Sequence, residues 1–171
     1  PQGQSRVDWR VLLRRYVGEC VDKAPSLSRP PRRFPHLTGI VPGSANSPER
    51  PKIMAVIDTS GSMTDSMLSE ICRELAFLAQ DRDVWVVECD AEIQKVYRYR
   101  HRITEVAGRG GTSFSPPLER AFLRKQRPDL VIFFTDGEGS APERPPQVKV
   151  VWVLTPDGTP PVPWGRVIRM P

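Results

Sequence analysis

Three short apolar runs constrain the fold of this chain most strongly. They are Ile53–Ile57, Val84–Val87 and Leu130–Phe134. Continuous apolar runs of this length predict strands that are buried on both faces, as in a parallel sheet. Between the first two runs, apolar side chains recur at helical spacing from Leu68 to Ala79, which predicts an amphipathic helix. This alternation of strands and helices indicates an α/β sheet.

The remaining elements extend the same pattern. Residues 93–99 alternate in character and follow the short turn Asp90–Glu92, which predicts an antiparallel edge strand. A helix is expected over residues 116–126, a buried strand over 148–154 and a short last strand over 167–170. The expected fold class is α/β: an open, mostly parallel, Rossmann-like sheet flanked by helices, with one antiparallel edge strand.

The first 50 residues have a different character. Residues 8–20 show helical periodicity, with Trp9, Leu13 and Val17 on one face. Prolines then recur from residue 25 to residue 51, at a density that no helix tolerates. We therefore expect residues 1–50 to form an N-terminal helix and a proline-rich strap packed on the core, and residues 51–171 to form the α/β domain.

Composition limits the cellular setting. No apolar run approaches the ~18–20 residues that span a bilayer, and the first residues lack the apolar segment of a signal peptide. The chain has an odd number of cysteines, namely Cys20, Cys72 and Cys89. No pair of them has the spacing of a metal site. Buried, reduced thiols are therefore expected, in a cytoplasmic protein with no membrane contact.

The formal net charge of +5 raises the question of nucleic-acid binding. However, the arginines are scattered, and many of them flank prolines. The one stretch in which basic and aromatic residues interleave, Tyr97–Arg102, also fits the predicted edge strand. No nucleic-acid partner is expected.

Polar residues with oxygen-bearing side chains follow the predicted strands. Asp58 ends the first strand and is followed by Ser60 and Ser62; Asp136 follows the third buried strand; Thr112 lies in a glycine-rich loop. Ligands of open α/β sheets bind beyond the carboxyl ends of the strands, so these side chains are expected to converge. Carboxylate and hydroxyl oxygens favour a small, hard cation, and the set contains no His or Cys for zinc. The expected ion is Mg²⁺, with Mn²⁺ or Ca²⁺ in second place.

This set of residues resembles the metal-ion-dependent adhesion site of von Willebrand factor A and integrin I-like domains. Segments along nearly the whole chain resemble a bacterial family of VWA-like proteins, whose longer members are described as carrying a putative metallopeptidase region. The chain has no His-Glu-x-x-His motif, so that label transfers no activity. The resemblance implies that one coordination position stays open for an Asp or Glu of a partner protein. It also implies, by analogy, a MoxR-type AAA+ ATPase as a partner.

Further residues are expected around the ion or at the partner interface. Asp65 and Glu138 are near enough in sequence to act through water, Arg109 is placed to meet an acidic partner, and Ser113 follows the metal threonine. Gly110 and Gly111 let their loop approach closely. The candidates beyond the ligands are thus Asp65, Arg109, Gly110, Gly111, Ser113 and Glu138.

Three further functions stay open beside a metal-dependent binding module. The first is an enzyme, because phosphotransfer hydrolases and response-regulator receivers also place an aspartate after the first strand, beside Mg²⁺. The hydrolases require a second Asp where this chain has Ser60, and no general base stands out, so no enzyme activity is expected. The second is an accessory region of a metallopeptidase-like protein, and the third is a scaffold whose site stays empty.

Overall fold

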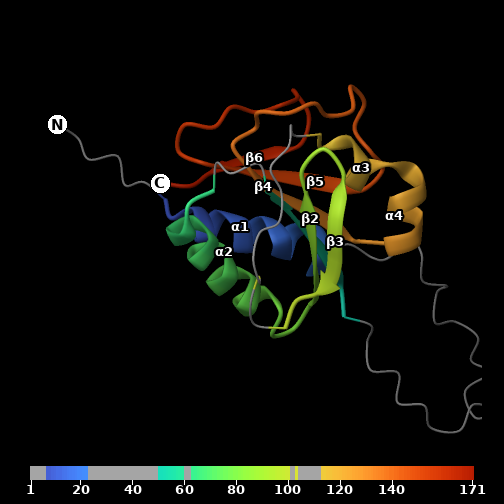
Figure 1. Cartoon of the computed structure of the whole chain (residues 1–171). Helices are drawn as coiled ribbons and strands as arrows, with labels where there is room; N and C mark the ends of the chain where they lie inside the picture. Colours follow the sequence, from blue (N-terminus) through green and yellow to red (C-terminus); the bar gives the residue numbers. More distant parts are fainter. Residues whose placement is uncertain (1–6, 23–49, 60–62, 101–102, 104–112) are drawn as a thin grey trace, which may run out of the picture.

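The computed structural model describes residues 7–22, 50–59, 63–100, 103 and 113–171. Six strands form one sheet in the order β3-β2-β1-β4-β5-β6 (Figure 1). The bounds are β1 Lys52–Asp58, β2 Asp83–Cys89, β3 Ile93–Arg98, β4 Leu130–Thr135, β5 Lys149–Leu154 and β6 Arg166–Arg169. Every neighbouring pair is parallel except β2 and β3. The predicted fold class is therefore confirmed.

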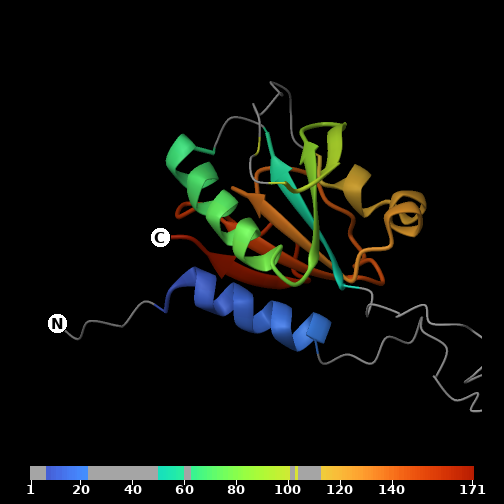
Figure 2. The same ribbon diagram turned by 90° about the horizontal axis from the view of Figure 1, so that it is seen from below.

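The helices cover both faces of this sheet (Figure 2). One face packs against α1 (Trp9–Val17), which continues into the π-helical turn η1 (Gly18–Asp22), and against α2 (Asp65–Leu78). The other face packs against the segment that contains α3 (Ser115–Leu118) and α4 (Arg120–Gln126). Because the central strands are apolar on both sides, each face needs a helical layer to exclude water.

The predicted helix over residues 116–126 is wrong in one respect: it is two short helices. The backbone of Glu119 is extended, with ψ 137°, and separates α3 from α4. Pro116 and Pro117 supply no amide hydrogens, so little holds the first turn in register with the second. The amide of Glu119 donates to the carbonyl of Pro116 over 3.3 Å and closes α3 as a single turn.

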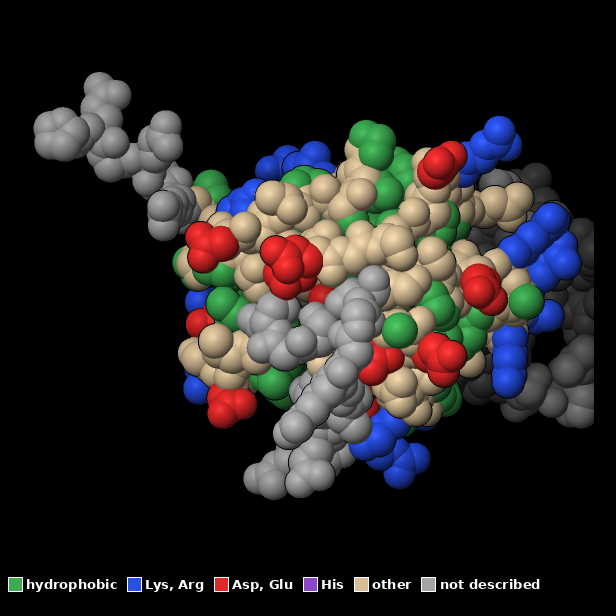
Figure 3. All heavy atoms as spheres, turned by 45° about the horizontal axis from the view of Figure 1, so that its top comes forward, with side chains coloured by type: hydrophobic (Ala, Val, Ile, Leu, Met, Phe, Trp, Pro, Cys, Tyr) green, Lys and Arg blue, Asp and Glu red, His purple; other side chains and the backbone are tan. Residues whose placement is uncertain are grey.

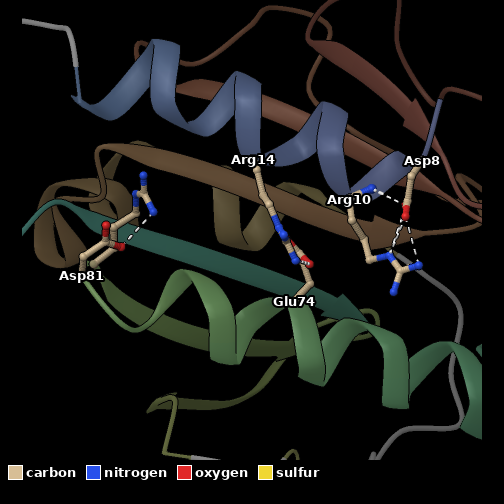
Figure 4. Close-up of polar contacts among 6 residues, drawn as sticks. Asp8, Arg10, Arg14, Glu74 and Asp81 are labelled. Carbon is tan, nitrogen blue, oxygen red and sulfur yellow. Dashed lines mark hydrogen bonds and ion pairs between the residues drawn. The ribbon is translucent and has the colours of Figure 1, made fainter.

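Helix α1 is joined to the sheet domain by both apolar and charged contacts. Trp9, Leu13 and Val17 are buried in the core that α1 shares with α2 and the sheet. Arg14 of α1 reaches Glu74 of α2 with two hydrogen bonds, Nε to Oε1 at 2.6 Å and a terminal nitrogen to Oε2 at 2.8 Å (Figure 4). The Arg14 guanidinium also lies 3.7 Å from the ring centroid of Phe77. The proline-rich segment of residues 25–49 is outside the described residues.

No helix in the described part of the chain has the length and apolar character needed to cross a membrane.

Candidate functional site

The strand order creates one reversal point in the sheet. The chain passes from β1 through α2 to β2 on one side of β1, and later enters β4 on its other side. Ligands of open α/β sheets bind in the crevice at such a switch point, beyond the carboxyl ends of the strands. Here those two ends carry Asp58, the last residue of β1, and Asp136, the residue after β4.

A short hydrogen bond fixes the Asp58 carboxylate against β4. The hydroxyl of Thr135 donates to Asp58 Oδ2 over 2.6 Å, in a place where both residues are buried. The same Thr135 oxygen accepts from the amide of Gly137 at 3.0 Å. Thr135 therefore connects the end of β1 with the turn that carries Asp136. The sequence analysis did not select Thr135; its position as the last strand residue before Asp136 was the one signal that could have found it.

Asp136 is held by its own turn. Its Oδ1 accepts from the amide of Glu138 at 2.9 Å, and its carbonyl accepts from the amide of Thr159 at 2.9 Å. The side chain is half-buried, whereas that of Glu138 is exposed. Glu138 thus helps to place Asp136 through its backbone amide, and its own carboxylate is in solvent.

A second loop reaches the same edge. The amide of Ser113 donates to the carbonyl of Asp90, at the end of β2, over 2.9 Å. Ser113 also forms a β-bridge with Ser140, in the loop after β4, and the two hydroxyls lie 3.5 Å apart. The chain at residue 113 is therefore fixed between the ends of β2 and β4.

The other candidates fall into two groups. Asp65 is exposed in the first turn of α2, where a carboxylate also stabilises the helix dipole, and Thr64 caps that helix. The remaining predicted residues lie outside the described part of the chain; they are Ser60, Ser62, Arg109, Gly110, Gly111 and Thr112.

The donor chemistry at this edge fits a hard cation. The Asp58 and Asp136 carboxylates follow adjacent parallel strands, and both classes of oxygen, carboxylate and hydroxyl, are present. The Thr59 hydroxyl, next to Asp58, is buried with no hydrogen-bond partner among the described residues. Figure 3, in which this edge is tilted forward, shows acidic side chains spread over the face and Lys and Arg mainly toward its rim. Among the described residues, no three His, Cys, Asp or Glu side chains gather into a metal site by themselves.

Two neighbouring groups have structural roles. Asp90 accepts from the amide of Glu92 and from Gln94, and these contacts hold its pKa below the usual range. Burial, together with the negative charges of Asp90 and Asp58, raises the pKa of the Cys89 thiol to about 12. Cys89 therefore stays protonated at neutral pH and is no nucleophile.

Comparison with known proteins agrees with the fold. Residues 53–171 match the family described as VWA-like domain (DUF2201). The chain belongs to this family. An uncharacterized protein of Thermotoga maritima is 32% identical over 143 residues, which are 80% of this chain and 34% of that protein. The chain thus spans about a third of the length of this relative. No solved structure matches the chain.

The family match begins at β1, so α1 lies outside it, although α1 shares the core. All five predicted ligands lie inside the matched residues.

Gly137 is a position where the turn beneath Asp136 admits no side chain. Its φ is +85°, and a Cβ there would overlap the carbonyl oxygen of Thr159. Gly137→Ala is expected to destabilise the fold by about 2 kcal/mol or more, since neither the strain nor the overlap can be relieved locally. Urea unfolding measures this effect. Gly139→Ala, at a glycine without positive φ, is the control and should change stability much less. Equal stabilities of the two variants would contradict the prediction.

A buried carboxylate on β2 makes the stability of the fold depend on pH. Glu88 is fully buried; burial raises its pKa, against smaller opposing effects of Lys95 and Tyr97. Below the unfolded-state pKa of about 4.3, Glu88 is protonated in both the folded and the unfolded protein. It then does not lower the free energy of unfolding. As the pH rises through the higher folded-state pKa, the fold loses stability because the buried group must ionise.

Glu88→Gln should therefore stabilise the protein at pH 7, by about 1 kcal/mol. Thermal unfolding of both proteins from pH 4 to pH 8 tests this. The gain should shrink toward pH 4, and a difference that does not vary with pH would refute the assignment.

Proposed function

We propose that the protein is a metal-dependent protein-binding module, with one divalent cation at the switch point of the sheet. Mg²⁺ is the preferred ion, followed by Mn²⁺ or Ca²⁺. The observation that supports this most directly is the Thr135–Asp58 hydrogen bond of 2.6 Å. It holds one carboxylate beside the end of the strand that leads into the other, Asp136.

Five side chains would hold the ion, directly or through water. Two carboxylates, Asp58 and Asp136, balance most of its charge. Three hydroxyls complete the set: Ser60 and Ser62 follow Asp58 in the chain, and Thr112 precedes Ser113, whose backbone the structure fixes at this edge. When bound, the cation supplies a positive centre with an open position for an anionic ligand.

The ligand of this open position would be an Asp or Glu of a partner protein. The resemblance to adhesion-site domains and membership of a VWA-like family support this assignment. A MoxR-type AAA+ ATPase is one partner that the resemblance implies, with the whole assembly in the cytoplasm. On this proposal the protein is not an enzyme and needs no nucleic acid or membrane. A carboxylate–metal contact in a closed interface contributes several kcal/mol, part of which is offset by desolvation.

Titration calorimetry of the wild-type protein with MgCl₂ and MnCl₂ tests metal binding. One saturable site per chain is expected, with a rise in melting temperature that EDTA reverses. Absence of both heat and thermal shift would favour a scaffold whose site stays empty.

Incubation with acetyl phosphate or a phosphatase substrate tests the rival enzyme function, and stable phosphorylation of Asp58 or turnover would overturn the binding-module proposal.

A further inference from the structure

A second concave site lies at the opposite edge of the sheet. A cavity of about 370 Å³ opens where β1 and β2 begin and where α2 ends. Four arginines and one aspartate line it; they are Arg50, Arg82, Arg98, Arg100 and Asp83. We call this site the basic cavity. Its residues come from β2, the end of β3 and the segments beside them, which lie far from Asp58 and Asp136 along the strands.

Part of the positive charge is balanced within the protein. Arg98 Nε lies 2.7 Å from Asp83 Oδ1, and Arg82 pairs with Asp81 at 2.9 Å. Arg50 and Arg100 are exposed, and neither forms an ion pair with any residue in the described ranges. The basic cavity therefore keeps an excess of positive charge that the described residues do not neutralise.

The walls of the basic cavity are partly apolar: beside the five charged residues and Gln80, four apolar or aromatic residues line it. Ala76 and Ala79 at the end of α2 line the cavity, and their small side chains leave space for it. Val84 and Tyr99 form its sides. The Tyr99 hydroxyl is used in the fold, since it donates to the carbonyl of Cys72 at 2.9 Å. Tyr99 thus contributes its ring to the lining. Sites of small organic ligands combine apolar walls with charged groups that orient the ligand, and their volumes begin at about 300 Å³.

We propose that the basic cavity binds a small organic phosphate: a phosphate group held by Arg50 and Arg100, with an apolar or aromatic body against Tyr99 and the end of α2. Guanidinium groups favour phosphate because their planar N–H donors form paired hydrogen bonds with its oxygens. Arg98 pairs with Asp83 through Nε, so its charge is balanced, but its terminal nitrogens can still donate hydrogen bonds to the phosphate. This site is independent of the divalent cation and of the function proposed above.

Titration calorimetry with ATP and with inorganic phosphate tests the proposal. EDTA is present throughout, so that no divalent cation occupies the candidate cation site. ATP is expected to bind at one site per chain, more tightly than inorganic phosphate, and more weakly as salt rises. Arg50→Glu and Arg100→Glu should each weaken ATP binding at least tenfold. Arg73→Glu, an exposed charge reversal on α2 outside the basic cavity, is the matched control and should bind as the wild type does.

Four results would overturn the proposal. They are no saturable ATP binding at low salt, equal affinity for ATP and inorganic phosphate, ATP binding that survives both charge reversals, and ATP binding that falls equally in the Arg73→Glu control. Thermal unfolding of each variant without ligand shows whether the fold is retained, and Arg50→Gln and Arg100→Gln provide milder substitutions if a reversal unfolds the protein.

Discussion

Replacing Asp58 by asparagine is expected to abolish the rise in melting temperature that Mg²⁺ gives the wild-type protein. The amide keeps the size of the side chain and an oxygen that accepts from Thr135, but it has no charge to offer a cation. A ligand at about 100 times its Kd stabilises a fold by about 2.7 kcal/mol, which corresponds to a shift of about 5–10 °C at this chain length. Differential scanning fluorimetry in MgCl₂ and in EDTA measures the shift in both proteins.

A matched control separates the site from general charge effects. Asp81→Asn makes the same substitution at an aspartate whose side chain is 71% exposed, outside the candidate site. It should keep the full Mg²⁺ shift. If Asp58→Asn also keeps it, Asp58 is not a ligand and the cation proposal fails. If Asp58→Asn is unfolded in EDTA, Asp136→Asn repeats the test at the half-buried carboxylate.

Removal of α1 is expected to prevent stable folding of the sheet domain, although the family match begins only at β1. Trp9, Leu13 and Val17 are at most 2% exposed, and burial of such side chains contributes about 1.5–3 kcal/mol each. Their loss approaches the total stability of an ordinary domain, about 5–15 kcal/mol. Circular dichroism and urea unfolding of residues 51–171 against the full chain test this. A cooperative transition at the same urea concentration would contradict it.

A single substitution tests the charged part of the same interface. Arg14→Ala leaves the Glu74 carboxylate, which is 1% exposed, without its partner, and a cost of about 2–4 kcal/mol is expected because Arg14 itself is partly solvated. Adding Glu74→Gln should recover part of this loss by removing the buried charge. Arg15→Ala breaks the exposed pair with Glu19 and should change stability by less than about 1 kcal/mol. Equal effects of Arg14→Ala and Arg15→Ala in urea unfolding would refute this role of Glu74.

The break at Glu119 shows a limit of periodicity. Leu118 and Phe122 have helical spacing, and the sequence pattern treats them as one face. Two consecutive prolines weaken the first turn without altering that spacing, so a pattern of apolar residues does not detect the change of direction. The strands were predicted well because burial on both faces imposes a continuous apolar run, which is a local signal.

The sequence likewise predicted some features of the site and missed others. Asp58 and Asp136 are found at the ends of adjacent strands, where the sequence predicted them. The roles of Ser60, Ser62 and Thr112 as ligands stay predictions. Thr135 was missed because a threonine that ends a buried strand is ordinary in sequence, and its bond to Asp58 joins residues 77 positions apart.

The sequence by itself determined which segments become strands and helices and which carboxylates end the strands, because these properties follow from burial patterns within ten or so neighbouring residues. Only the tertiary structure decided that β1 lies between β2 and β4, that Arg14 meets Glu74 and that four arginines share one cavity. Each of these depends on contacts between distant parts of the chain, whose free energy appears only when the layers pack together.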